Sequence, residues 1–154
     1  MPTNTAAWIP AKSAQLEIGP APYTPPGEAQ IVVRNHAAAV NPLDWIIKLG
    51  GPVAYRWLTY PSVLGSDVAG GVVEVGSGGT PLPVGDRVPG HAVGTDKDSN
   101  TAAQGAYQNY TVAPERLASP IPASLPYENA CLLPLALSTA ALGEPTTRAR
   151  RIRK

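Results

Sequence analysis

The side chains of this sequence that could do chemistry are few and widely spaced. It has a single cysteine, Cys131, and two histidines, His36 and His91. A zinc site needs several cysteine, histidine or carboxylate ligands at short range, and these residues form no close pair. Cys131 lies in an apolar run without nearby positive charge, so we expect a core thiol and no nucleophile. We expect His91 to be a loop or edge-strand residue, and we predict no metal site.

One glycine-rich segment, Gly76–Pro81, could be mistaken for a phosphate-binding loop. A dinucleotide-binding loop has three spaced glycines and leads into a helix whose N-terminus holds the pyrophosphate. Here Pro81 occupies the position of the third glycine, and Pro83 prevents a helix from starting soon after it. The segment therefore predicts a turn without a phosphate site.

The amino-acid composition limits which folds could hold the candidate side chains. The 154-residue chain is 44% hydrophobic and 15% charged, which is typical of one globular domain. Its 15 glycines and 18 prolines favour short strands joined by turns over a helical bundle. Residues 1–143 carry seven basic and ten acidic side chains, a net charge of −3, so this part of the chain offers no basic surface for nucleic acid. No segment reaches 18 consecutive apolar residues and no secretory signal is evident, so we expect a cytoplasmic protein that contacts no membrane.

Several segments favour β structure. Gln30–Ala37, Val68–Val75 and Tyr107–Ala113 are rich in β-branched residues or tyrosine and are predicted strands. Glycines within Val68–Val75 would let another backbone approach closely, and glycines elsewhere suit the corners of a bent sheet. We therefore predict a mainly β fold, a strongly bent antiparallel barrel with a few short helices.

Two regions predict helices. In Asn41–Asp44 the asparagine can cap a helix, proline suits its first position and aspartate its third. This helix should end at Gly50 and Gly51. A second helical region starts near Ser124–Glu128, and Pro134 should divide it into two short helices. Residues 130–143 carry no charge, so we expect them to need burial against other protein.

Ordered motifs resemble the N-terminal GroES-like domain of the medium-chain dehydrogenase/reductase superfamily. Within it they are most similar to the zinc-free branch, which includes quinone oxidoreductases and fungal trans-acting enoyl reductases. The resemblance covers residues 5–143 and is carried by Asn41–Asp44, Gly65–Gly76, Val84–Val88, Gly105–Val112 and Leu133–Gly143.

The resemblance implies a domain organisation. Residues 1–125 would form the GroES-like domain, and residues 126–143 a helical segment leading to a nucleotide-binding domain. That Rossmann domain is expected to be absent, because the chain passes at Glu144 into an atypical basic tail, residues 144–154. We expect the tail to be disordered and the chain to be truncated or misframed; a localisation or polyanion-binding tail is a less favoured alternative.

Differences from the zinc alcohol dehydrogenases indicate the chemistry. Those enzymes resemble this chain but have a cysteine near the position of Asn41 and a His-Glu pair at Ser66 and Asp67. The resemblance therefore implies zinc-independent, NADPH-dependent reduction of an activated C=C bond, in an enoyl thioester or a quinone or enone. Hydride addition spreads negative charge onto the conjugated oxygen, where hydrogen-bond donors can stabilise it.

Site residues follow from the same resemblance. Lys48 and Thr139 are the candidate catalytic donors. Alternatively, Lys48 is an exposed helix lysine without a role, Thr139 caps a helix start, and Asn41 serves only as a cap. The expected contacts to the nicotinamide end of NADPH are Asn41, Trp45, Ile46, Ile47, Lys48 and Thr139.

Other polar residues are expected to be structural. Asp67 is one of them, and Asp86 and Arg87 should form a local ion pair beside a turn fixed by Gly85.

More than one function remains compatible with the sequence. As an enzyme, the protein would act on a small-molecule or carrier-bound enoyl or quinone substrate, and the isolated chain would be weakly active or inactive. The alternative is a non-enzymatic binding or regulatory module that uses the same barrel and associates through residues 130–143. A zinc alcohol dehydrogenase with rearranged ligands and a co-chaperonin are less favoured.

Overall fold

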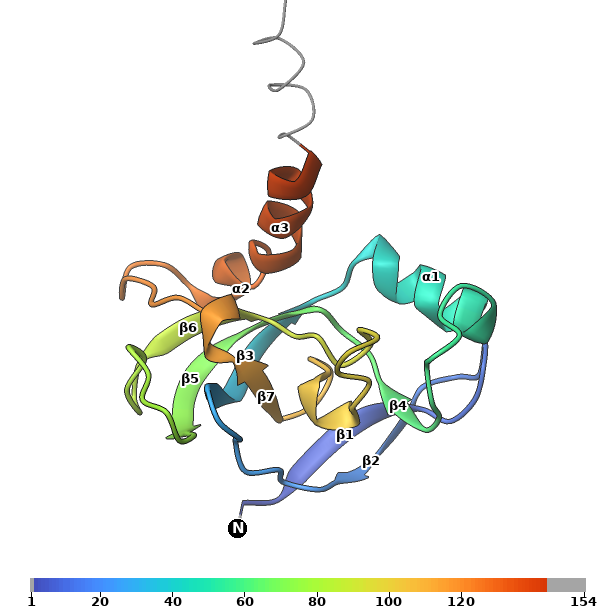
Figure 1. Ribbon diagram of the computed structural model, residues 1–154, viewed down its shortest axis with the longest axis horizontal. Helices are drawn as coiled ribbons and strands as arrows, with labels where there is room; N and C mark the ends of the chain where they lie inside the picture. The colour runs from blue at the N-terminus through green and yellow to red at the C-terminus, as the bar shows by residue number, and fades with distance from the viewer. Residues whose placement is uncertain (1, 144–154) are drawn as a thin grey trace, which may run out of the picture.

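The computed structural model describes residues 2–143, which form two antiparallel sheets facing each other (Figure 1). The predicted tail, residues 144–154, lies outside the described residues. The smaller sheet has the order β2-β1-β4 and contains β1 (Asn4–Ile9), β2 (Glu17–Ala21) and β4 (Ser62–Val63). The larger sheet has the order β6-β5-β3-β7 and contains β3 (Gln30–Ala39), β5 (Asp67–Val75), β6 (Arg87–His91) and β7 (Tyr110–Pro114). The predicted mainly β, GroES-like fold is confirmed.

The long β3–β5 pair bends the larger sheet. Register shifts interrupt the pair between Val32 and Val33 and between Asn35 and Ala37, and bulges of this kind increase twist and curvature. Gly70 allows a close approach of the two strands, because a Cβ atom there would collide with the carbonyl oxygen of Arg34. The predicted close contact of another backbone with this strand is confirmed.

Three apolar clusters fill the interior. The largest is built on the strands of the larger sheet and includes Ile31, Val68 and Val88, which are all fully buried. The second joins the smaller sheet to the first helix, and its buried members are Ile9, Ile47, Leu58 and Leu64. The third packs the chain around Cys131 against strands β3 and β5 and contains Ala39, Ala69, Ala130 and Cys131.

The helices form where the sequence predicts them. Helix α1 (Pro42–Gly50) follows Asn41 and is capped by Gly51, whose φ of 46° suits glycine. Pro134 separates α2 (Tyr127–Ala130) from α3 (Pro134–Gly143), which confirms the predicted break. Short 3-10 turns are η1 (Gly51–Val53), η2 (Ala102–Gln104) and η3 (Glu115–Leu117). In Figure 1, α1 and α3 both project from the upper rim of the barrel.

The remaining segments connect the strands. After β5 the glycine-rich segment turns at Gly78 and Gly79, both with positive φ, and leads to β6. The predicted turn is thus present, and a strand follows it. Among residues 2–143, no helix combines the length and the apolar character that crossing a bilayer requires.

Candidate functional site

A buried carboxylate connects the starts of α1 and α3. Asp67, the first residue of β5, is only 1% exposed. Its Oδ2 accepts a hydrogen bond from Asn41 Nδ2 at 2.9 Å, and its Oδ1 accepts one from the backbone N–H of Leu135 at 2.7 Å. Asn41 directly precedes α1, and Leu135 is the second residue of α3. We call Asn41, Asp67 and the Leu135 N–H the Asp67 junction.

A second buried carboxylate fixes the first turn of α1. Asp44 Oδ2 accepts hydrogen bonds from the Asn41 N–H and from the Tyr107 hydroxyl, both at 2.8 Å. Its Oδ1 accepts one from the Gly65 N–H at 3.1 Å. Because these donors come from three separate parts of the chain, Asp44 ties the start of α1 to the barrel wall.

Burial shifts the pKa of two of these groups. Desolvation raises the pKa of Asp67, although the hydrogen bonds from Asn41 and Leu135 and the nearby His91 act against that rise. Desolvation also raises the pKa of Tyr107, and its hydrogen bond to Asp44 adds to this effect. The Tyr107 hydroxyl therefore keeps its proton at neutral pH and acts as a donor.

The sequence assigns four residues of α1 to cofactor binding, and their side chains lie in different surroundings. Trp45 and Ile46 are 63% and 46% exposed and form an apolar outer face. Ile47 is 1% exposed and packs against Ile9, Leu58 and Leu64, so its side chain is part of the core and cannot face a ligand on that outer surface. The partly buried Lys48 lies near the other end of α1 from the Asp67 junction.

Thr139 is exposed in the middle of α3. The alternative that it caps a helix start is wrong, because α3 begins at Pro134. Within the described residues, no hydrogen bond connects Thr139 with Lys48. The structure thus brings Asn41 to the start of α3 and leaves the two candidate donors on separate helices.

Several other predicted residues can be placed. His91 ends β6, an edge strand of the larger sheet, as predicted, and its Nδ1 lies 3.4 Å from Ser138 Oγ. Cys131 is 3% exposed in the apolar core, and burial raises the pKa of its thiol, which confirms the expected core residue.

The predicted ion pair of Asp86 with Arg87 is wrong. The Arg87 guanidinium donates to the carbonyl oxygens of Pro122 and Leu125 at 2.9 and 2.8 Å and lies 4.3 Å from the centre of the Tyr127 ring. No ion pair of Asp86 with Arg87 is present in residues 2–143. The guanidinium is instead directed toward the segment that leads into α2.

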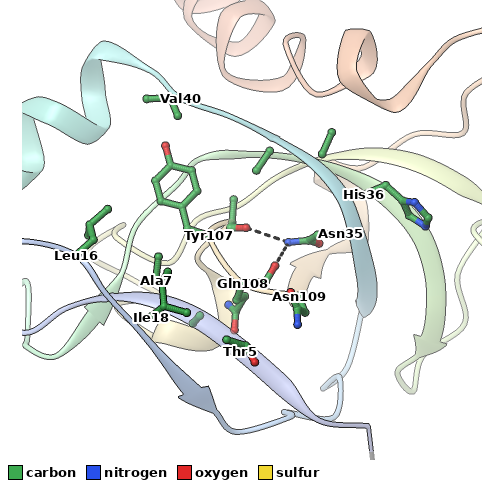
Figure 2. Close-up of a pocket in the computed structure, with 14 residues that line it drawn as sticks. Thr5, Ala7, Leu16, Ile18, Asn35, His36, Val40, Tyr107, Gln108 and Asn109 are labelled. Atoms are coloured by element: carbon green, nitrogen blue, oxygen red, sulfur yellow. Dashed lines mark hydrogen bonds between the residues drawn. The ribbon is translucent and has the colours of Figure 1, made fainter.

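A groove of about 530 Å³ lies between β1, β2 and β3 (Figure 2). Figure 2 shows Asn35 in its wall, where Nδ2 donates to the backbone oxygens of Ala106 and Gln108 at 3.0 and 2.7 Å. Exposed Ile18 and Val40 stand at its rim. None of the predicted cofactor-contacting residues lines this groove.

The residues around Asp67 do not match a zinc ligand set. Position 41 offers an amide, position 66 a buried serine hydroxyl, and Asp67 uses both carboxylate oxygens for N–H donors. Zinc prefers thiolate, imidazole and free carboxylate ligands. Within residues 2–143, no three histidine, cysteine or acidic side chains lie close enough together to hold a metal ion.

Comparison with known protein families shows which family this fold belongs to. Residues 27–123 match the family described as the alcohol dehydrogenase GroES-like domain. The chain belongs to this family. The matched residues include α1 and Asp67, so the predicted family resemblance is confirmed for the part of the chain that contains most of the candidate site.

Among sequence relatives of this GroES-like chain are fungal dehydrogenases and reductases. Dehydrogenase pigH of Monascus ruber is 55% identical over 144 residues, which cover 93% of this chain and 39% of pigH. Trans-enoyl reductase himH of Aspergillus japonicus is 44% identical over 141 residues, which cover 90% of this chain and 39% of himH. The chain therefore spans about two fifths of the length of these relatives.

Solved structures show the same architecture. An alcohol dehydrogenase superfamily protein from Novosphingobium aromaticivorans has a TM-score of 0.79 at 30% identity, covering 90% of this chain and 40% of that protein. A mycobacterial protein solved in complex with NADPH has a TM-score of 0.72 at 26% identity, covering 94% of this chain and 42% of that protein.

Sequence reasoning missed the central position of Asp67 and Tyr107. It treated Asp67 as structural and Tyr107 only as part of a strand. One signal was available: an aspartate at the start of the apolar strand Val68–Val75 must find donors, because a buried carboxylate without them is very costly. The identity of those donors could not be read from the sequence, because Leu135 lies 68 residues away.

Proposed function

We propose that this chain is the barrel domain of a zinc-independent, NADPH-dependent reductase that acts on an activated C=C bond. The substrate class is an enoyl thioester or a quinone or enone, free or bound to a carrier. The observation that carries the proposal is the Asp67 junction, where an amide and a hydrogen-bonded carboxylate occupy the positions that zinc enzymes give to metal ligands. The relative himH, named a trans-enoyl reductase, supports the reaction class.

Exposed apolar side chains on α1 fit the nicotinamide end of the cofactor. Trp45 and Ile46 present an apolar surface that a flat heterocyclic ring could cover. Thr139 is exposed on α3 and presents a hydroxyl group. NADPH, when bound, would supply the hydride. Trp45 and Ile46 would exclude water from its reactive face. The related mycobacterial structure in complex with NADPH supports this choice of cofactor.

The remaining candidate residues would stabilise the negative charge that develops on the substrate during reduction. Reduction of a conjugated C=C bond places negative charge on the carbonyl oxygen, and a donor already in place lowers the barrier. The Thr139 hydroxyl and the Lys48 ammonium are the donors in this proposal, and the Asn41 amide is held by Asp67 at the edge of the site. Ile47 supports the outer face from the core.

We further propose that the 154-residue chain alone turns over weakly or not at all. Its described part offers the nicotinamide end a helix face, and its glycine-rich turn after β5 leads to a strand, which does not bind a pyrophosphate as a helix N-terminus does. Binding would therefore rest on a small part of the cofactor. Titration of the chain with NADPH, followed by cofactor fluorescence, tests this; micromolar binding would contradict it.

A chimera tests the reductase proposal directly. Residues 1–143 would replace the matching segment of himH, and NADPH oxidation would be measured with an enoyl thioester, an enone and a quinone. We expect turnover with at least one substrate and a loss in kcat/KM of about tenfold in Thr139→Val, the effect of one hydrogen bond to a charged group. Thr3→Val, at an exposed position beside β1, is the matched control. A folded chimera without turnover would contradict the proposal.

The exposed apolar face around α3 favours a second candidate function. Leu132, Leu137 and Leu142 are 58%, 61% and 83% exposed, and such a patch on a helix is typical of an interaction surface. The second candidate is a non-enzymatic binding module that associates through residues 130–143. A stable dimer that binds no NADPH would favour this module over the reductase.

A further inference from the structure

We propose that Asp67 is a positioning residue, which sets the direction of α3 relative to α1 and so determines where Thr139 lies. The proposal deepens the reductase function above and rests on it for its catalytic consequence. Its structural part concerns only residues 2–143. Among the described residues, no hydrogen bond joins Asp67 to either candidate donor, so its effect on them must pass through the two helices.

The first turn of α3 lacks a capping residue of its own. The residue before Pro134 is Leu133, whereas helix starts prefer serine, threonine, aspartate or asparagine. Asp67 Oδ1 takes over this role from 68 residues away, because it accepts the Leu135 N–H at 2.7 Å. A carboxylate at a helix N-terminus is also favoured by the helix dipole. The hydrogen bond to Asp67 therefore stabilises the start of α3.

The same carboxylate holds the start of α1. The backbone N–H of Asn41 donates a hydrogen bond to Asp44. The side-chain amide of Asn41 donates a separate hydrogen bond to Asp67 Oδ2 at 2.9 Å. Asp67 itself is paired on both sides, with Ala39 of β3 and with His91 of β6. One side chain on a doubly paired strand thus joins the two helices.

Beyond this junction, α3 is weakly attached. Its side chains Leu137 and Leu142 are exposed, and the contact of Ser138 Oγ with His91 Nδ1 is long at 3.4 Å. Thr139 comes about one turn after Leu135, so a change in the direction of the first turn moves its hydroxyl directly. Misplacement of a reacting group by about 1 Å can cost roughly 100-fold in rate.

Distance measurement between spin labels tests the junction in the 154-residue chain without cofactor. Labels would be attached at Leu49→Cys on α1 and Leu142→Cys on α3, both exposed positions, in a Cys131→Ala background. We expect one narrow distance peak, which Asp67→Ala abolishes. Asp67→Asn should keep the peak, because its amide oxygen still accepts the Leu135 N–H and its amide nitrogen can donate to the side-chain oxygen of Asn41 once that amide turns over. Thr111→Ala, a fully buried substitution in β7, should also keep it.

Hydrogen exchange provides a second readout on the same variants. Loss of a hydrogen bond to a charged group should make the amides of α3 exchange at least about tenfold faster in Asp67→Ala. The amides of β3 should keep their protection in this variant. An unchanged distance peak together with unchanged exchange in α3 would overturn the proposal.

A further variant covers the case in which Asp67→Ala does not fold. Asn41→Ala removes only the α1 side of the junction and should also broaden the distance peak. An unchanged peak in Asn41→Ala would overturn the claim that the junction links both helices.

The himH chimera separates this proposal from the reductase function. If the distance peak is lost in Asp67→Ala while the parent chimera has no turnover, the positioning role stands and the reductase function fails. If the chimera is active and Asp67→Ala leaves both the peak and kcat unchanged, the positioning role fails and the reductase function stands. We expect a lost peak and a kcat at least about tenfold lower, as for a displaced reacting group.

Discussion

Helices α1 and α3 carry the candidate cofactor contacts, yet different forces hold them. Helix α1 places Ile47 in an apolar cluster and Asp44 in a network of three donors. Helix α3 is attached at its first turn through Asp67, and further along it leaves Leu137 and Leu142 exposed. The comparison shows that α1 is built into the barrel core, while the start of α3 is held by a hydrogen bond to one buried carboxylate.

The largest effect on stability is expected when a side chain on the buried side of α1 is shortened. Ile47→Ala should lower the free energy of unfolding by about 2–5 kcal/mol, because it leaves a cavity among packed side chains. Ile46→Ala is the matched control, since Ile46 is 46% exposed, and should change stability by less than about 0.5 kcal/mol. Urea denaturation of both variants measures the difference. Equal losses would mean that α1 is not anchored by its inner face.

A smaller loss is expected when the polar anchor of α1 is weakened. Tyr107→Phe removes the hydroxyl that donates to Asp44 at 2.8 Å and should cost about 1–3 kcal/mol. Tyr127→Phe is the control, because the Tyr127 ring, not its hydroxyl, makes the contacts with His36 and Arg87. If urea denaturation shows no difference between the two variants, the Asp44 network does not stabilise α1.

The same hydroxyl should make stability depend on alkaline pH. Burial raises the pKa of Tyr107 above the ordinary value of 10.0, and burial with a hydrogen bond to Glu74 raises that of Tyr23 to about 12. The folded state then holds these protons while the unfolded state releases them, so stability is complete below about pH 10 and falls as the pH rises above it. Unfolding free energies measured from pH 8 to 11 should show this fall. The fall should be shallower in Tyr107→Phe, and an equal slope would contradict the assignment.

The smallest effect on stability is expected on the exposed side of α3. Leu137→Ser combined with Leu142→Ser should change the free energy of unfolding by less than about 1 kcal/mol, because both side chains are largely exposed. Sedimentation velocity should show that the wild-type chain associates as its concentration rises and that the double variant does not. A wild-type chain that stays monomeric would show that residues 130–143 do not mediate self-association.

Local features of the fold could be predicted because neighbouring residues determine them. Asn41 and Pro42 define the start of α1, Pro134 divides the last helical region, and the glycine at position 70 marks the close approach of β3 and β5. Each depends on a residue type that restricts its own backbone or permits a rare contact.

The assembly of the site could not be predicted in the same way. Asp44 and Ile47 are spaced to face one side of α1, but which side the barrel covers depends on packing with distant residues such as Ile9 and Leu64. The Asp67 junction depends on an N–H donor 68 residues away, which no local pattern reveals. The assignment of α1 and α3 to the cofactor stays a prediction, and the burial of Ile47 could not be read from the resemblance.

Metal dependence of the himH chimera most directly tests the central claim that this barrel supports reduction without zinc. The chimera would be dialysed against a chelator, its zinc content measured, and NADPH oxidation followed with its enoyl substrate. We predict no bound zinc and an unchanged turnover, because the Asp67 carboxylate is already occupied by Asn41 and Leu135. One zinc per chain, with turnover lost on chelation and restored by added zinc, would contradict the account.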